Sequence, residues 1–502
     1  MSQSTDTLDP GVTAPGLGPS AEEKPQHRWW VLGVIALAQL MVVLDATIVN
    51  IALPTAQKDL GFSDGNRQWI ITAYALAFGS LLLLGGRLAD LIGRKTVFLI
   101  GVAGFAGASA LAGAAPNFEV LVTGRALQGV FGAMLAPAAL ALLNITFTSA
   151  KERAKAFGVY GAIAGAGGGI GLLLGGVLTQ HLSWRWTLYV NLFIAVFAFV
   201  GGLMLLRTTK RTERPKLDIP GTVLASAGLF SLVFGFSNAE SDGWSSPMTW
   251  GFLAASVVLI GLFTWWQTKT THPLLPLRIL ADRDRGASFA VAAICSIGMF
   301  GVFLFLTYFL QGTLGFTPVK TGLGFLPMIG ALMVTAQLAT NSLIPRFGPR
   351  PVVPVGLIMA AGGLVWMTGL DQSSTYAAHV LPPLILMGLG IGLVMPPAMS
   401  LATSGISAQD AGAGSAAVNT MQQIGGAIGT ALLNTIAASA ATNYLAGKQP
   451  TRGVLMQAQL ESYSTAYWWS AGFFAAGAVL ALLMYRSGRP APLEGSAPVV
   501  HM

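Results

Sequence analysis

Apolar segments of about twenty residues recur along this chain, and this is the length that an α-helix needs to cross the hydrocarbon core of a bilayer. Only 10% of the residues are charged and the mean hydropathy is +0.65, whereas a soluble domain has about 25% charged residues. We therefore expect an all-α integral membrane protein with fourteen transmembrane helices, near residues 30–53, 68–88, 96–114, 119–143, 157–179, 186–206, 220–239, 249–267, 287–310, 321–342, 352–370, 380–402, 411–437 and 466–486.

The basic residues are distributed unevenly between the loops. With fourteen spans both termini lie on one side, and that side holds 21 of the 28 Lys and Arg residues, against six on the other. Because loops rich in Lys and Arg stay in the cytoplasm, we expect cytoplasmic termini and a location in the plasma (inner) membrane. The net charge of +8 is then a topology signal, and no nucleic acid is expected as a partner.

The chain contains a faint internal repeat. Residues 90–95, between the second and third spans, match residues 345–350, between the tenth and eleventh. The same spacing pairs Asp45 with Phe300 and Arg125 with Val380, so any ionisable pair belongs to the first half. The expected parts are a disordered cytoplasmic tail (1–28), an N-terminal six-helix bundle (29–206), an inserted helix pair (219–268), a C-terminal six-helix bundle (285–486) and a second cytoplasmic tail (487–502).

Asp45 is the one carboxylate in the middle of a span, and Arg125 also lies within a span. A charged side chain costs about 2.5–3.5 kcal/mol there on insertion scales, and it usually serves a proton or ion pathway. A nearby cation favours the ionised carboxylate and desolvation favours the neutral acid, so a conformational change can load or release a proton. We predict proton coupling by this pair. The alternative is a structural ion pair or cap that fixes the first helix against the fourth.

The first helix has two polar faces. At about 100° per residue, Gln39, Thr47 and Asn50 gather on one side and Asp45 points about 120–160° away from them. We expect the first face to line a cavity, and Asp45 to face the helix of Arg125 and Gln128. The candidates for substrate contact are Gln39, Thr47, Asn50, Tyr74, Gln128, Gln311, Asn419 and Gln422. Each of them can instead bond to a neighbouring helix.

The loop after the second span combines glycines with charged residues. Gly86 and Gly93 allow a tight turn, and Asp90 can accept hydrogen bonds at the positive end of a neighbouring helix, a contact worth about 0.3–1 kcal/mol. Such a contact biases one of two conformers. The alternative is that the basic residues of this loop only set topology, which is the expected role of Arg87.

Several motifs in residues 29–486 resemble those of fourteen-helix drug/proton antiporters of the major facilitator superfamily. They are LDATIVNIALP (44–54), GRLADLIGRK (86–95), LVTGRALQG (121–129), the glycine-rich run 167–176, WRW (184–186) with Asn191, and HPLLPL (272–277). The resemblance implies the major facilitator fold, with two six-helix bundles plus two inserted helices, and transport by alternating access. Leu172 stands where the glycine-rich motif usually has proline.

The resemblance also implies roles for these residues. Asp90 is expected to touch span thirteen near Gly412. Conformational gating is expected of Gly86, Asp90, Gly93, Arg94, Lys95, Gly167, Gly171, Gly175 and Gly176. For the glycines of the fifth span, close packing of small residues is the alternative.

Nothing in the chain indicates an enzyme, a cofactor or a metal site. It lacks a Gly-x-x-x-x-Gly-Lys phosphate loop, so ATP is not expected to drive it, and its five His are not spaced as ligands. Cys295 has no partner for a disulfide. The leading hypothesis is a secondary exporter of hydrophobic or cationic drug-like molecules in exchange for protons. The alternatives are an exporter of a specific metabolite, such as a self-made antibiotic, and a lipid-translocating facilitator.

Overall fold

The computed structural model describes residues 25–488, apart from residues 63, 148, 208–216, 408–409 and 450. These residues form helices and no strands. Most of the two expected tails lies outside the described residues. The boundary of the first tail was placed too late, because helix α1 already begins at Pro25.

The described elements follow the expected order of two halves with an inserted pair. In the first half they are α1 Pro25–Leu60, α2 Asp64–Ile92, α3 Arg94–Gly113, α4 Phe118–Thr146, α5 Ala150–His181 and α6 Trp186–Leu205. The inserted pair is α7 Ile219–Ser241 and α8 Pro247–Gln267. The second half contains α9 Leu277–Ala281, α10 Arg283–Tyr308, η1 Phe309–Thr313, α11 Pro318–Leu338, η2 Ala339–Leu343, α12 Ile344–Phe347, α13 Pro349–Met367, η3 Tyr376–Val380, α14 Leu381–Ala402, α15 Ala411–Leu445 and α16 Arg452–Met484.

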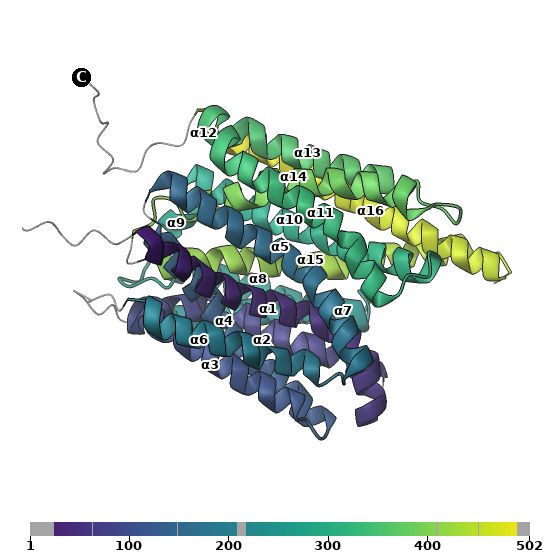
Figure 1. Ribbon diagram of the computed structural model, residues 1–502, viewed down its shortest axis with the longest axis horizontal. Helices are drawn as coiled ribbons and strands as arrows, with labels where there is room; N and C mark the ends of the chain where they lie inside the picture. The colour runs from purple at the N-terminus through teal and green to yellow at the C-terminus, as the bar shows by residue number, and fades with distance from the viewer. Residues whose placement is uncertain are drawn as a thin grey trace, which may run out of the picture.

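Fourteen of the described helices are long and apolar enough to cross a membrane, as predicted. The largest deviation is the last, which was expected at 466–486 but occupies Arg452–Met484. A helix need not end where the hydrocarbon ends, so the polar first turns of α16 continue beyond the apolar run. Helix α1 begins and α16 ends at the same end of the molecule (Figure 1), as an even number of spans requires.

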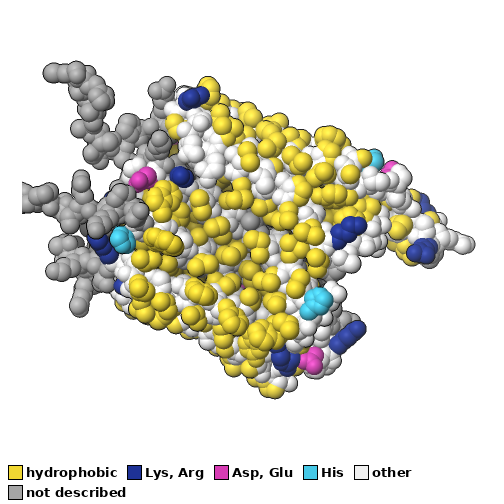
Figure 2. All heavy atoms as spheres, viewed as in Figure 1, with side chains coloured by type: hydrophobic (Ala, Val, Ile, Leu, Met, Phe, Trp, Pro, Cys, Tyr) yellow, Lys and Arg dark blue, Asp and Glu magenta, His cyan; other side chains and the backbone are white. Residues whose placement is uncertain are grey.

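The polarity of the surface differs between the long sides of the molecule and its two ends. Apolar side chains cover the long sides of the visible face, and most charged groups lie toward its two ends (Figure 2). On the lipid side of α8, Trp250, Val257 and Trp265 are each more than half exposed. At the end opposite the start of α1, the visible surface is hollowed between the two halves (Figure 2).

The two halves meet along a few helices. Helix α5 packs on α11 and α14, and α15 packs on α2 and α4. The expected repeat is visible in the backbone, since Gly93 and Gly348 precede α3 and α13 with φ of 106° and 78°. A side chain is strained at such angles, which explains why glycine occupies both positions.

The inserted pair is attached to both halves. Helix α7 packs on α2 and α15, and α8 packs on α7. Asp218 caps α7 and is only 5% exposed. Its carboxylate accepts hydrogen bonds from Gly221 N–H (2.9 Å), Trp266 Nε1 (2.8 Å) and Gln267 Nε2 (2.8 Å). A longer bond from Leu274 N–H ties in the segment that follows α8.

This carboxylate is expected to fix the inserted pair. Burial alone would raise the pKa of Asp218, but the hydrogen bonds outweigh it and lower the pKa below 3.8, so the group is ionised at neutral pH. Asp218→Ala should lower the free energy of unfolding by about 1–2 kcal/mol through the lost cap. Thermal unfolding in detergent measures this loss. Asp242→Ala, at the exposed other end of α7, is the control, and an equal effect of both variants would contradict the role of Asp218.

Candidate functional site

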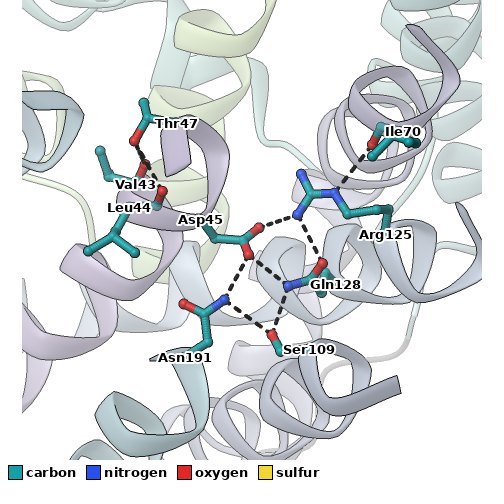
Figure 3. A network of polar contacts seen from close by, with 9 residues as sticks. All are labelled: Val43, Leu44, Asp45, Thr47, Ile70, Ser109, Arg125, Gln128 and Asn191. Carbon is teal, nitrogen blue, oxygen red and sulfur yellow. Dashed lines mark hydrogen bonds and ion pairs between the residues drawn. The ribbon is translucent and has the colours of Figure 1, made fainter. Parts of the chain in front are cut away.

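Asp45 and Arg125 form a buried ion pair between α1 and α4. Arg125 Nη1 lies 2.5 Å from Asp45 Oδ2, and the two residues are 1% and 0% exposed, respectively. Figure 3 shows both side chains pointing toward each other from their helices. The prediction that Asp45 faces the helix of Arg125 is confirmed.

Two amides complete the coordination of the carboxylate. Gln128 Nε2 and Asn191 Nδ2 both donate to Asp45 Oδ1, at 2.8 and 2.7 Å. Both amides also donate to Ser109 Oγ, at 2.7 and 3.3 Å, and all these groups converge in Figure 3. Asp45 therefore accepts three hydrogen bonds from α4 and α6. An ionised carboxylate is an acceptor only, so this arrangement fits the deprotonated acid.

Arg125 connects this network to α2. Its Nε donates to the carbonyl of Ile70 at 3.2 Å, its Nη1 donates to Gln128 Oε1 at 2.9 Å, and its guanidinium carbon lies 4.5 Å from the centre of the Tyr74 ring. Removing one partner of a buried ion pair generally costs about 3–5 kcal/mol, because the other charge is left unpaired. Loss of either charge is therefore expected to weaken this contact between α1 and α4.

A second cluster joins the two halves at the end where α2 meets α15. Asp90, on α2, accepts hydrogen bonds from the backbone N–H groups of Gly412 (3.1 Å) and Ala413 (3.2 Å). Arg94 donates to the same carboxylate at 3.2 Å. The expected contact of Asp90 with the start of span thirteen is therefore present, and the positive end of α15 faces a carboxylate.

The other residues of this loop have distinct positions. Lys95 Nζ donates to the carbonyls of Leu203 and Leu206 at the end of α6. Arg87 is only 5% exposed and interacts electrostatically with Asp90. The expectation that Arg87 only sets topology is corrected, because its charge also acts on the Asp90 carboxylate.

Gly86 allows α2 to touch α15 at the backbone. A Cβ at Gly86 would lie 2.5 Å from the carbonyl oxygen of Gly412, and a Cβ at Gly412 would lie 2.3 Å from the carbonyl oxygen of Gly86. Such separations are too short for any side chain. Together with Asp90, these glycines close the two halves against each other at this end.

The glycines of α5 pack against α1. A Cβ at Gly167 would meet Val43 at 2.7 Å, one at Gly171 would meet Thr47 Oγ1 at 2.0 Å, and one at Gly175 would meet Ile48 at 3.0 Å. Gly176 is buried. This contact supports the close-packing interpretation, and the gating role of these residues stays a prediction.

The substrate-cavity candidates differ in how deeply their side chains are buried. Tyr74 and Gln128, 6% and 0% exposed, belong to the Asp45 network, and Gln39 accepts a hydrogen bond from Tyr160 at 2.6 Å. Asn419, 7% exposed, donates to the carbonyl of Ser415. Neighbouring helices cover the side chains of these four in this conformation, and their contact with a substrate stays a prediction. Those with more exposed surface are Thr47, Gln311 and Gln422, and the side chain of Asn50 lies outside the described part.

Ser109 and Asn191 complete the network without having been predicted as site residues. In the sequence, Asn191 was noted only as a residue that follows the WRW motif, and no motif included Ser109. A sequence signal for both residues was present, because each is a polar residue in an apolar span. In the structure both are 0% exposed. Only the packed helices show their contacts: Asn191 donates to Asp45, and Ser109 accepts from Gln128 and Asn191.

Comparison with known proteins decides the family. Residues 35–430 match the model of the Major Facilitator Superfamily. The chain belongs to this superfamily. Among solved structures, the human organic anion transporter MFSD10 covers 91% of the chain with a TM-score of 0.60 and 16% identity, which shows the shared fold.

Curated superfamily members extend the similarity. The puromycin resistance protein of Streptomyces alboniger is 47% identical over 98% of both chains. The tetracenomycin C resistance and export protein of Streptomyces glaucescens is 36% identical over 82% of this chain and 76% of its own. The multidrug resistance protein Stp of Mycobacterium tuberculosis is 33% identical over 82% of this chain and 77% of its own. This superfamily member is therefore a multi-pass membrane transporter of small molecules.

Proposed function

We propose that this superfamily member exports hydrophobic or cationic drug-like compounds in exchange for protons, from the plasma membrane and with both termini in the cytoplasm. The observation that carries the proposal is the sealed Asp45–Arg125 pair. It is a titratable group held away from water by helices that must move during alternating access. No ATP is required, since one proton crossing 100 mV supplies about 2.3 kcal/mol.

Helix α2 couples the proton site to the contact between the halves. Its outer part holds Arg125 through the carbonyl of Ile70 and the ring of Tyr74, and its inner end carries Gly86 and Asp90 against α15. Protonation of Asp45 removes the negative charge that pairs with Arg125, so the contacts of Arg125 with α2 change. A shift of α2 then weakens the contact with α15 and opens the cytoplasmic side.

The present conformer fits the outward-facing stage of this cycle. The halves are closed at the end that the basic residues assign to the cytoplasm, and the opposite end is hollowed (Figure 2). The donors around Asp45 favour the ionised acid, which is the form that awaits a proton from outside.

The related proteins support a drug-like substrate. Their names describe resistance to puromycin, export of tetracenomycin C and multidrug resistance. Asp45 is the carboxylate in the middle of the described spans, and one such acid among apolar helices fits drug-like substrates better than a sugar, which would need several fixed polar groups. Export of one self-made antibiotic is the second candidate, and the resemblance to single-antibiotic exporters favours it.

Transport by purified protein in liposomes tests the proposal. Ethidium should accumulate on the acidic side of an imposed pH gradient, about tenfold per pH unit for one-for-one exchange, and protons should move in the opposite direction. A proton ionophore should abolish both fluxes. Absence of gradient-driven flux for ethidium, puromycin and tetracenomycin C would overturn drug/proton exchange, whereas lipid movement without a gradient would favour the lipid facilitator.

A further inference from the structure

Asn191 has an unusual place in the Asp45 network. It lies on α6, is 0% exposed, and donates its Nδ2 to Asp45 Oδ1 and to Ser109 Oγ. No described residue donates a hydrogen bond to its Oδ1. A buried acceptor without a partner is generally costly. Asn191 is therefore the member of the network whose acceptor oxygen has no described partner.

Protonation of Asp45 changes what the network must provide. The neutral acid carries an O–H group that needs an acceptor. This group takes the place of one of the lone pairs that receive hydrogen bonds in the ionised acid. Arg125 cannot accept, because a guanidinium has donors only. Gln128 Oε1 is directed at Arg125 and accepts from it, and Ser109 Oγ receives both amides, whereas Asn191 Oδ1 accepts from no described residue. Asn191 Oδ1 remains.

A half-turn of the Asn191 amide would bring this acceptor to Asp45. The two ends of an amide are nearly equal in shape, so the rotation exchanges a donor for an acceptor without repacking α6. In either orientation one end of the amide lacks a described partner, and after the turn the Ser109 hydroxyl can donate to Oδ1 in place of the hydrogen bond that it now accepts from Nδ2, so the orientations differ mainly in their contact with Asp45. The same rotation of Gln128 would instead turn donors toward the Arg125 guanidinium.

The geometry points to Asn191 as a positioning residue for proton binding, whose amide donates to ionised Asp45 and turns to accept from the protonated acid. This inference rests on the proposed proton coupling and adds a residue to it. The proton comes from water on the side to which the site opens, an O–H bond forms at Asp45 Oδ1, and no other covalent bond changes. Among described residues of the five helices around the carboxylate, the charged or titratable groups that face it are Arg125 on α4 and Tyr74 on α2.

Infrared difference spectroscopy of the purified protein in lipid tests the inference. When the pH is lowered, a carbonyl band of protonated Asp45 should appear, and this band should be missing in Asp45→Asn. In Asn191→Leu this band should move to higher frequency, because the acid has lost its acceptor. In Asn191→Thr, whose hydroxyl can donate and accept, the band should stay near its original position. A band that is absent from the wild type, or unchanged in Asn191→Leu, would overturn the inference.

The pH profile of transport gives a second readout. Asn191→Leu removes a hydrogen bond from both protonation states, so efflux should fall roughly tenfold with little displacement of its pH dependence, and Asn191→Thr should restore it. If Asn191 instead donated to Asp45 in both protonation states, Asn191→Leu would destabilise the ionised acid and shift the pH profile of efflux to higher pH. That result would also overturn the inference. The infrared bands need no transport, so failure of proton-coupled export and failure of the Asn191 role are separable. Gel filtration confirms folding of each variant.

Discussion

Asp45→Asn is expected to reduce gradient-driven efflux to the background of empty liposomes. The amide cannot bind and release a proton, and with its one oxygen toward the Arg125 guanidinium, which lies 2.5 Å from the carboxylate in the wild type, its NH₂ group faces the donors of Gln128 and Asn191. An unpaired buried arginine should also lower the free energy of unfolding by about 3–5 kcal/mol. Efflux under an imposed pH gradient and thermal unfolding in detergent measure the two effects.

Two further variants separate the lost proton from a lost fold. Asp45→Glu keeps a titratable group and should retain part of the coupled efflux, whereas Asp371→Asn, a change of the same chemistry at an exposed position, should retain nearly all of it. Exchange of labelled substrate across the membrane without a gradient should survive in Asp45→Asn. Undiminished uphill efflux in this variant would exclude Asp45 as the coupling residue.

Gly412→Ala is expected to open the contact between the halves at the cytoplasmic end. The added Cβ would lie 2.3 Å from the carbonyl oxygen of Gly86 and 2.7 Å from Asp90 Oδ1, so α2 and α15 must separate. Separation breaks the hydrogen bonds from Gly412 and Ala413 to Asp90 and shifts the population toward the inward-facing state. If this contact loses about 1.4 kcal/mol of its stabilising free energy, the equilibrium between the outward-facing and inward-facing states shifts tenfold.

Thiol labelling can measure this shift, because the chain has a single cysteine, Cys295, which is buried. In a Cys295→Ser background, Asn144→Cys places a thiol where Asn144 now donates to the carbonyl of Thr403 across the two halves. Its labelling rate should rise in Gly412→Ala. Gly426→Ala, on the same helix, is the control because a Cβ there meets nothing within 4 Å. Equal labelling rates in the two glycine variants would show that the backbone contact does not hold the seal.

The transmembrane spans could be predicted because the stability of a segment in lipid is a sum over its own residues. The same local reasoning identified Asp45 and Arg125 as costly residues that need partners. The contact of Asp90 with Gly412 was reached through the family resemblance, since residues so distant in the chain show no relation in a single sequence. Helix ends were less certain, as α16 shows, because water beyond the bilayer does not stop a helix.

The roles of individual polar residues depended on tertiary packing. Tyr74 and Gln128 were expected to line a cavity, yet both are buried around Arg125, and Asn191 joins them from a helix for which no role in coupling was predicted. Helical periodicity gives directions within one helix only. How α1, α2, α3, α4 and α6 are rotated against one another depends on the shapes of all their contacts, including those of glycine.

From the sequence alone came the class of protein, the number of spans, the side of the termini as a prediction, and the presence of one buried acid with a candidate cation. Each follows from local free energies of transfer and from the distribution of charge. The tertiary structure alone decided that three donors surround Asp45, that one acceptor of Asn191 is left over, and that α2 joins this network to the contact with α15. Hydrogen bonds between distant segments exist only once the helices are packed.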